Sequence, residues 1–240
     1  MFNQTALLVM GLITAGLGLT VATVNWSSRS NRPLALYLLL LGVNMALDSE
    51  GGRTWQAMII TLNSLTFIAA IEWANRIGSK VKGPRRDAAT WLFRIAQLVT
   101  LAMFIVGMVF AFGMPEQQDT AGFVRSSTLE LALFLPLIGS ILLFGFIAGV
   151  ILSTAIRDSA DLLRLRVVGL ASPFLLSGLF LSETVIPFTI AFGVMILIAG
   201  LFRYQMILGR RGSFMSQFLA PEVAELVREQ GMAQVMRRER

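Results

Sequence analysis

Seven long apolar stretches, separated by short charged segments, make up most of this 240-residue chain. A helix that crosses the hydrocarbon core of a bilayer needs roughly 20 mostly apolar residues. The stretches that meet or approach this length are 5–25, 33–50, 54–75, 88–113, 128–156, 167–184 and 187–208. The pattern therefore predicts an all-α integral membrane protein, built as a bundle of seven transmembrane helices.

The composition excludes several other classes of protein. Hydrophobic residues make up 55% of the chain and charged residues 14%, against about 25% charged residues in a typical soluble domain. Cysteine and histidine are both absent, which rules out disulfides, thiol catalysis and the usual ligands of zinc and haem. The two lysines, Lys80 and Lys82, lie in a charged loop, so a Schiff base inside the membrane is excluded. We expect no metal and no cofactor in these 240 residues.

The distribution of basic residues predicts the orientation of the bundle. Of the 20 Lys and Arg residues, Arg53 and Arg125 lie on one side of the predicted spans, Arg94 lies inside a span, and the others lie on the opposite side. Basic loops stay in the cytoplasm. We therefore expect an outer N-terminus and a cytoplasmic C-terminus. The formal charge of +6 follows from this topology, and we expect no nucleic-acid partner.

Polar and charged residues gather at the predicted outer ends of the spans. They are Asn44, Asp48, Glu50, Arg53, Glu130 and Glu183. Asn44 and Asp48 are four residues apart and share one helix face. Two interpretations are open. These residues mark helix ends in water, or they line an outward-facing vestibule that binds a ligand or an ion.

Four more polar residues, Gln56, Asn63, Glu72 and Arg94, lie within the predicted spans. Gln56 and Asn63 are seven residues apart on one stripe, which favours hydrogen bonds between helices. Glu72 precedes Arg76 by four residues, the favourable order for an ion pair along a helix; a proton relay is the alternative. Arg94 lies near the basic end of its span, from which its side chain can reach the membrane surface.

Tryptophans and small residues give two further expectations about the spans. Trp73 and Trp91 fall near predicted cytoplasmic helix ends, which is typical of the aromatic belt at a membrane surface. Gly145 and Gly149 form a GxxxG motif, a spacing that lets helices approach closely. A similar small-residue spacing begins at Gly18.

The character of the chain changes after residue 208. A Gly-Arg-Arg-Gly sequence at 209–212 interrupts the apolar run. Further on, Pro221 opens a predicted helix, and one apolar stripe joins Leu219, Val223, Leu226 and Val227. We therefore divide the chain into a seven-helix membrane domain, residues 1–208, and a cytoplasmic linker with a short amphipathic helix, residues 209–240.

The segment Phe218–Val227, FLAPEVAELV, and the Arg-Arg-Glu-Arg end at Arg237–Arg240 resemble the helix that precedes the catalytic domain of bacterial class III adenylate cyclases. This resemblance implies the N-terminal membrane region of such an enzyme, in the cytoplasmic (inner) membrane. The parent protein would convert ATP to cyclic AMP and diphosphate, and ATP and a divalent metal would bind only in its catalytic domain. Guanylate specificity stays open. We expect no catalytic residue in the present 240.

The resemblance also implies a homodimer, because class III cyclases form their active sites between two catalytic domains. The residues that would transmit a signal between the membrane and these domains are Phe214, Phe218, Leu219, Pro221, Val223, Leu226 and Val227.

Three functions remain open. The first is a sensory or regulatory membrane domain, with the bilayer, a second copy and a small-molecule or lipid ligand as partners. The second is a passive anchor without a ligand. The third is a small polytopic transporter or channel, for which the outer acidic cluster and Glu72 are the supporting features.

Overall fold

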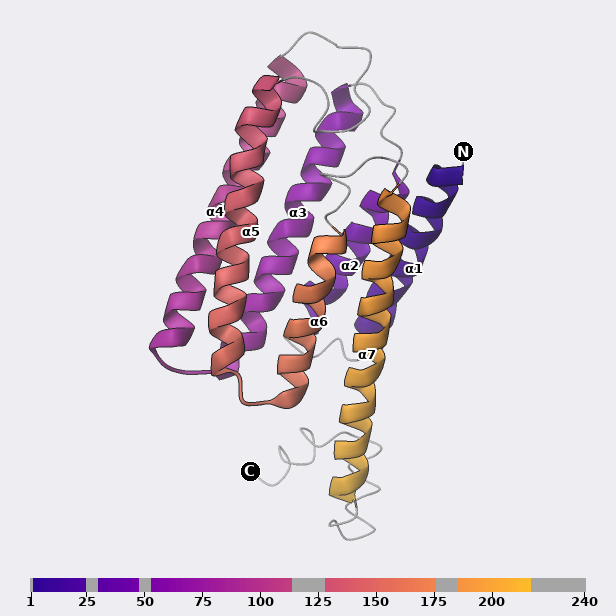
Figure 1. Ribbon diagram of the computed structural model, residues 1–240, viewed down its shortest axis with the longest axis vertical. Coiled ribbons are helices and arrows are strands. Elements are labelled where there is room, and N and C mark those ends of the chain that lie inside the picture. Colours follow the sequence, from indigo (N-terminus) through magenta and orange to yellow (C-terminus); the bar gives the residue numbers. More distant parts are fainter. Residues whose placement is uncertain (1, 25–29, 48–52, 114–127, 176–184, 217–240) are drawn as a thin grey trace.

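The structure is a computed structural model that describes residues 2–24, 30–47, 53–113, 128–175 and 185–216. In these residues the chain forms helices and no strand. The helices are α1 (Phe2–Val24), α2 (Asn31–Ala46), α3 (Arg53–Ile77), the 3₁₀ turn η1 (Gly78–Lys80), α4 (Pro84–Gly113), α5 (Thr128–Ala155), α6 (Ser159–Leu175) and α7 (Ile186–Ser216) (Figure 1).

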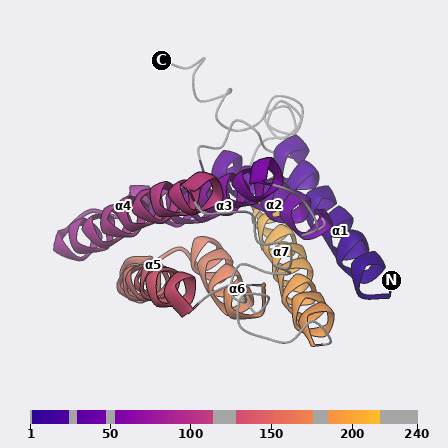
Figure 2. The same ribbon diagram turned by 90° about the horizontal axis from the view of Figure 1, so that it is seen from above.

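The helices form two layers. Helices α1 to α4 lie side by side in one layer, and α5 to α7 form the other (Figure 2). Helix α5 packs on α4, α6 touches α3, and α7 touches α1. Successive helices run in alternating directions, so α2, α4 and α6 begin at the end of the bundle from which α7 projects (Figure 1). We call this end the basic end, because Arg32, Arg76, Arg86 and Arg157 lie at or beside the helix ends found there.

Five helices are long and apolar enough to cross a membrane. The candidate spans are Gln4–Thr23, Thr54–Ile77, Pro84–Phe112, Ala132–Ala155 and Ile186–Arg210, from α1, α3, α4, α5 and α7. Helices α2 and α6 have 16 and 17 residues in the described part of the chain, which is short of the roughly 20 residues of a typical span. The seven-span count and the orientation therefore stay predictions.

Two helix boundaries differ from the sequence-based expectation. Helix α6 begins at Ser159 rather than near residue 167, because its first turns carry charged residues that an apolar count leaves out. The Asp158 carboxylate accepts a 2.9 Å hydrogen bond from the backbone N–H of Ala160 and caps this start. Helix α7 continues through Gly209 and Gly212 to Ser216, so the helix extends beyond residue 208, where the predicted span ends.

The core lies between the two layers. Among its largest fully buried side chains are Leu34 and Leu38 of α2, Trp73 of α3, Phe93 of α4 and Leu152 of α5. The burial of Trp73, which is 1% exposed, corrects its assignment to an aromatic belt.

Trp91 does fit that assignment, with 72% of its surface exposed on the outer side of α4. The two tryptophans thus differ in environment although both lie near the basic end. The difference arises from the helix face on which each one lies.

Glycine brings α1 and α2 into backbone contact. A Cβ placed on Gly11 would lie 2.5 Å from the carbonyl oxygen of Gly42, and a Cβ on Gly42 would lie 2.5 Å from the carbonyl oxygen of Gly11. Gly18 lies in the same seam, opposite Ala35 of α2. By contrast, a Cβ on Gly145 or Gly149 would meet no atom within 4 Å. The GxxxG motif of α5 is therefore not a packing contact within the described chain.

Candidate functional site

Two asparagines join α2 to α3. The Asn44 side-chain amide donates a hydrogen bond of 2.6 Å to Oδ1 of Asn63. The prediction that Asn63 bonds between helices is thus confirmed, and its partner is a residue that the sequence assigned to the vestibule. Gln56, also expected to bond between helices, is half-buried two turns before Asn63. Asn44 therefore stabilises the contact between α2 and α3.

The remaining vestibule residues are outside what the structure describes in full. Asp48, Glu50 and Glu183 lie outside the described residues. Arg53 and Glu130 belong to the first turns of α3 and α5, but their side chains are not described. The vestibule therefore stays a prediction.

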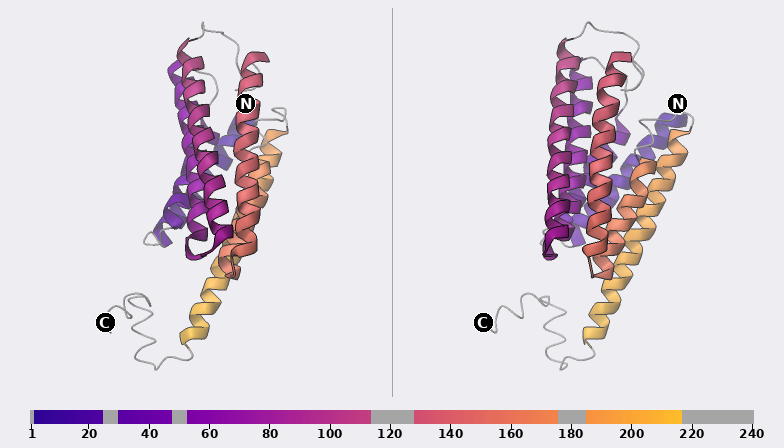
Figure 3. Two further views of the ribbon diagram at one scale, coloured as in Figure 1. Left: turned by 90° about the vertical axis from the view of Figure 1, so that its left-hand side faces the viewer. Right: turned by 60° about the vertical axis from the view of Figure 1, so that its left-hand side comes forward.

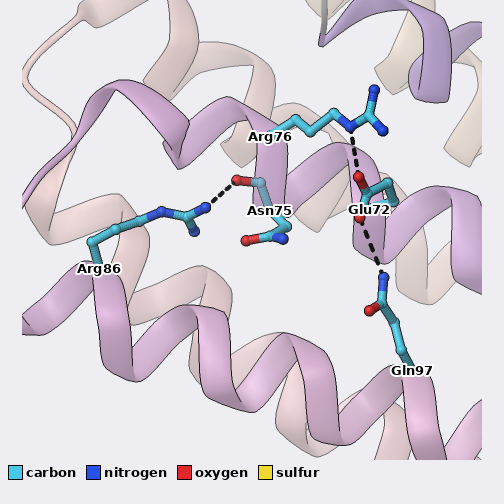
Figure 4. Close-up of polar contacts among 5 residues, drawn as sticks. All are labelled: Glu72, Asn75, Arg76, Arg86 and Gln97. Carbon is cyan, nitrogen blue, oxygen red and sulfur yellow. Dashed lines mark hydrogen bonds and ion pairs between the residues drawn. The ribbon is translucent and has the colours of Figure 1, made fainter.

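Glu72 of α3 accepts hydrogen bonds from two side chains (Figure 4). Arg76 Nε donates to Glu72 Oε1 at 2.6 Å, and Gln97 Nε2 of α4 donates to Glu72 Oε2 at 3.4 Å. The predicted ion pair with Arg76 is confirmed. Because both carboxylate oxygens face donors, the arrangement favours a structural link between α3 and α4 over a proton relay.

Arg86 of α4 adds a second link between the same helices. Its Nη2 donates a 2.8 Å hydrogen bond to the backbone carbonyl oxygen of Asn75, in the last turn of α3 (Figure 4). Carbonyl groups at a helix C-terminus lack partners within the helix and attract cations. Arg86 lies between two predicted spans, and the sequence alone does not predict this contact. A basic residue just beyond a helix end is the signal that indicates it.

Arg94 lies on an exposed face of α4. It lies at the end of the third turn of the helix that starts at Pro84. Its exposure fits the expected reach toward the membrane surface, and no candidate site includes it.

Arg164 is the main charged residue that sequence analysis placed wrongly, between two predicted spans. It lies in the second turn of α6 and is only 4% exposed. The spacing of apolar residues along α6 indicates that Arg164 is buried. Ala160, Arg164, Val168, Ala171 and Leu175 recur at intervals of three or four residues and are all buried, so Arg164 occupies a core-facing position.

The Arg164 guanidinium connects three helices. Nη2 donates a 2.8 Å hydrogen bond to Oδ1 of Asn31, the first residue of α2. Nη1 lies 3.4 Å from the Tyr204 hydroxyl of α7 and 3.5 Å from Ser30 Oγ. The guanidinium carbon also lies 4.7 Å from the centre of the Tyr204 ring, a cation–π distance.

Arg164 has no counter-ion among the described residues, and one of its nitrogen atoms lacks a hydrogen-bond partner. Its Nε is buried and has no hydrogen-bond partner. No described carboxylate lies within 4 Å of the Arg164 guanidinium. We name Ser30, Asn31, Arg164 and Tyr204 the Arg164 cluster.

The structure does not describe the side chains of the residues expected to transmit a signal. Phe214 belongs to the last turn of α7, but its side chain is not described. Phe218, Leu219, Pro221, Val223, Leu226 and Val227 lie outside the described residues.

The chain thus belongs to the broad class of all-helical proteins with several helices able to cross a membrane. Comparisons with protein-family models, curated proteins and solved structures find no match.

Proposed function

We propose that this chain is the regulatory membrane domain of a class III adenylate cyclase, and that it acts on the geometry of cytoplasmic catalytic domains. Its sequence support is the Phe218–Val227 segment that resembles the lead-in of such domains. Its structural support is the length and position of α7. The proposal assigns signal detection to the helix bundle and cyclic AMP synthesis to the domain that follows.

Helix α7 carries the proposal. It has 31 residues and so extends about 46 Å at about 1.5 Å per residue, against a hydrocarbon core about 30 Å thick. Both views in Figure 3 show its end projecting beyond the other helices of the bundle. The helix ends at Ser216, two residues before Phe218. A displacement of α7 in the bundle would therefore reach the segment that resembles the cyclase lead-in.

The packing of α7 supports a mechanical role. Gly200 of α7 faces Val167 of α6 with no space for a Cβ, and a Cβ on Gly193 would lie only 3.0 Å from Leu175 of α6. The Arg164 cluster fixes α7 to α2 and α6 near the point where it leaves the bundle. A ligand would act on α7 only if it binds two arrangements of these helices with different affinity.

The passive anchor differs from this proposal in having no signal to transmit. Two insertion variants of the full-length protein distinguish the regulatory domain from the passive anchor. One variant carries two extra alanines after Arg210 in α7, and the other carries seven at the same place. Two residues rotate the following chain by about 200°, whereas seven residues restore the original face within about 20°. We expect cyclic AMP production in cyclase-deficient bacteria to change strongly with two alanines and little with seven. Equal activity in both would contradict the regulatory proposal and favour the anchor.

Two direct measurements test the cyclase assignment itself. The coding sequence after Arg240 must continue into a class III catalytic domain; a stop codon there would overturn the assignment. Purified chain in mild detergent should have the mass of a dimer by light scattering corrected for detergent. A monomer, with or without residues 213–240, would leave dimerisation to the catalytic domain and weaken the proposed mechanism.

The transporter alternative has no observation in its favour beyond the sequence. Glu72 faces two donors, and the acidic residues of the vestibule are outside the described side chains. Ion flux into proteoliposomes that disappears in Glu72→Gln would support a transporter and contradict the regulatory proposal.

A further inference from the structure

The Arg164 cluster contains a buried cation without a counter-ion among the described residues. Taking a guanidinium out of water is costly unless an opposite charge and hydrogen bonds compensate for the lost hydration. Arg164 has one hydrogen bond of good length, to Asn31 at 2.8 Å. Its other two contacts, to Tyr204 and Ser30, are long for hydrogen bonds, and its Nε has no partner.

The start of α2 adds positive electrostatic potential at the same place. Arg164 contacts Ser30 and Asn31, the N-cap and the first residue of α2. A helix N-terminus carries a partial positive charge and is stabilised by an anion. The first turn of α2 has no acidic residue, and it includes the exposed Arg32. A buried cation and a helix N-terminus therefore meet without a described negative charge between them.

We propose that the Arg164 cluster is a binding site for a phosphate-type oxyanion. The planar edge of a guanidinium matches two phosphate oxygens, and the buried Nε of Arg164 has no hydrogen-bond partner. The Tyr204 hydroxyl adds a neutral donor within 3.4 Å of Nη1. The anion would approach along the start of α2, where Arg32 is exposed and Ser30 and Asn31 are half-buried.

Two sources supply this chemistry. The cluster lies near the basic end of the bundle, at the starts of α2 and α6, where the headgroup of an anionic phospholipid would lie if these helices span a bilayer. Free phosphate from the aqueous phase is the other source. In either case the anion would lie between α2, α6 and α7 and stabilise their junction. This proposal does not depend on the cyclase assignment.

The test uses the full chain in nanodiscs and its thermal unfolding. One arm compares nanodiscs of phosphatidylcholine alone with nanodiscs containing one-fifth phosphatidylglycerol. The other arm adds inorganic phosphate to phosphatidylcholine nanodiscs, with sodium chloride at equal ionic strength as the reference. We expect the Tm to rise by several degrees in at least one arm, because a ligand that binds the folded state stabilises it. A rise with phosphatidylglycerol alone identifies a headgroup, and a saturable rise with inorganic phosphate identifies a soluble anion.

Arg164→Gln and Arg166→Gln form a matched pair. Both remove one positive charge from α6, but Arg164 is buried and Arg166 is exposed. We expect Arg164→Gln to lose the rise in Tm and Arg166→Gln to keep it. If Arg164→Gln fails to fold, Arg164→Lys keeps the charge without the fork and should raise the Kd of the anion about tenfold or more. No rise in Tm for the wild type in either arm would overturn the proposal, as would equal rises in all variants.

Discussion

Asn44 and Asn63 form a hydrogen bond of 2.6 Å between α2 and α3, in a bundle whose other contacts are mainly apolar. The bond involves two side chains that are both half-buried. In an apolar environment each amide would otherwise lose hydrogen bonds to water, so we expect the pair to stabilise the contact between these helices.

The first prediction concerns this pair. Asn44→Ala and Asn63→Ala should each destabilise the protein, and the double variant should cost less than their sum. The expected coupling energy is about 0.6–1.7 kcal/mol, the range measured for hydrogen bonds between helices in membranes. Reversible unfolding in mixed micelles measures the cycle. A coupling energy near zero would show that the two amides act independently.

The second prediction concerns the contact between α1 and α2. Gly42→Ala should destabilise the protein by about 1–3 kcal/mol, because its Cβ would collide with the carbonyl oxygen of Gly11. Gly16→Ala is the control. A Cβ at Gly16 meets no atom within 4 Å, so this variant should leave stability unchanged or raise it slightly. Equal effects of the two variants in the same unfolding assay would contradict the backbone contact.

The third prediction concerns Glu72. Glu72→Gln should reduce stability by less than about 1 kcal/mol, because the ion pair is partly exposed, with 43% of the Arg76 side chain and 32% of the Glu72 side chain accessible. Glutamine keeps one oxygen that can accept the hydrogen bond from Arg76, and its NH₂ group can donate to Gln97 once the Gln97 amide turns over. Unfolding at low and high salt measures the ionic part, which should shrink as salt increases. A loss of several kcal/mol would indicate a buried charge pair instead.

The fourth prediction concerns the environments of two tryptophans. Lipid with brominated acyl chains should quench the fluorescence of Trp91, which is exposed, and should leave that of Trp73, which is buried. Trp91→Phe should therefore remove a quenchable part of the emission, and Trp73→Phe should remove an unquenched part. Trp26 and Trp55 are common to both variants and cancel in the comparison. Strong quenching that disappears with Trp73→Phe would contradict the core position of Trp73.

Local features of this fold could be predicted from the sequence. Apolar runs located the seven α-helices of the described residues, because each run exceeds a few helical turns. The ion pair of Glu72 and Arg76 was predictable because its partners are four residues apart on one helix. This expectation depends only on neighbours along one helix.

Features that depend on the arrangement of helices could not be predicted in the same way. The partner of Asn63 is 19 residues away, and the second donor to Glu72 is 25 residues away. Arg164 lies between the predicted spans 128–156 and 167–184, because hydropathy alone cannot show that a charged turn continues a helix into the core. For the vestibule and the segment after Ser216, the described residues offer no test.

The reciprocal contact of Gly11 and Gly42 constrains how the bundle can move. Two helices whose backbones touch resist sliding along each other, because at Gly11 and Gly42 no flexible side chain lies between the backbones to change its rotamer. We therefore expect α1 and α2 to act as one rigid body. Any rearrangement that involves α7 would then occur at its seams with α1 and α6, and the α1–α2 pair would provide the fixed frame against which α7 shifts.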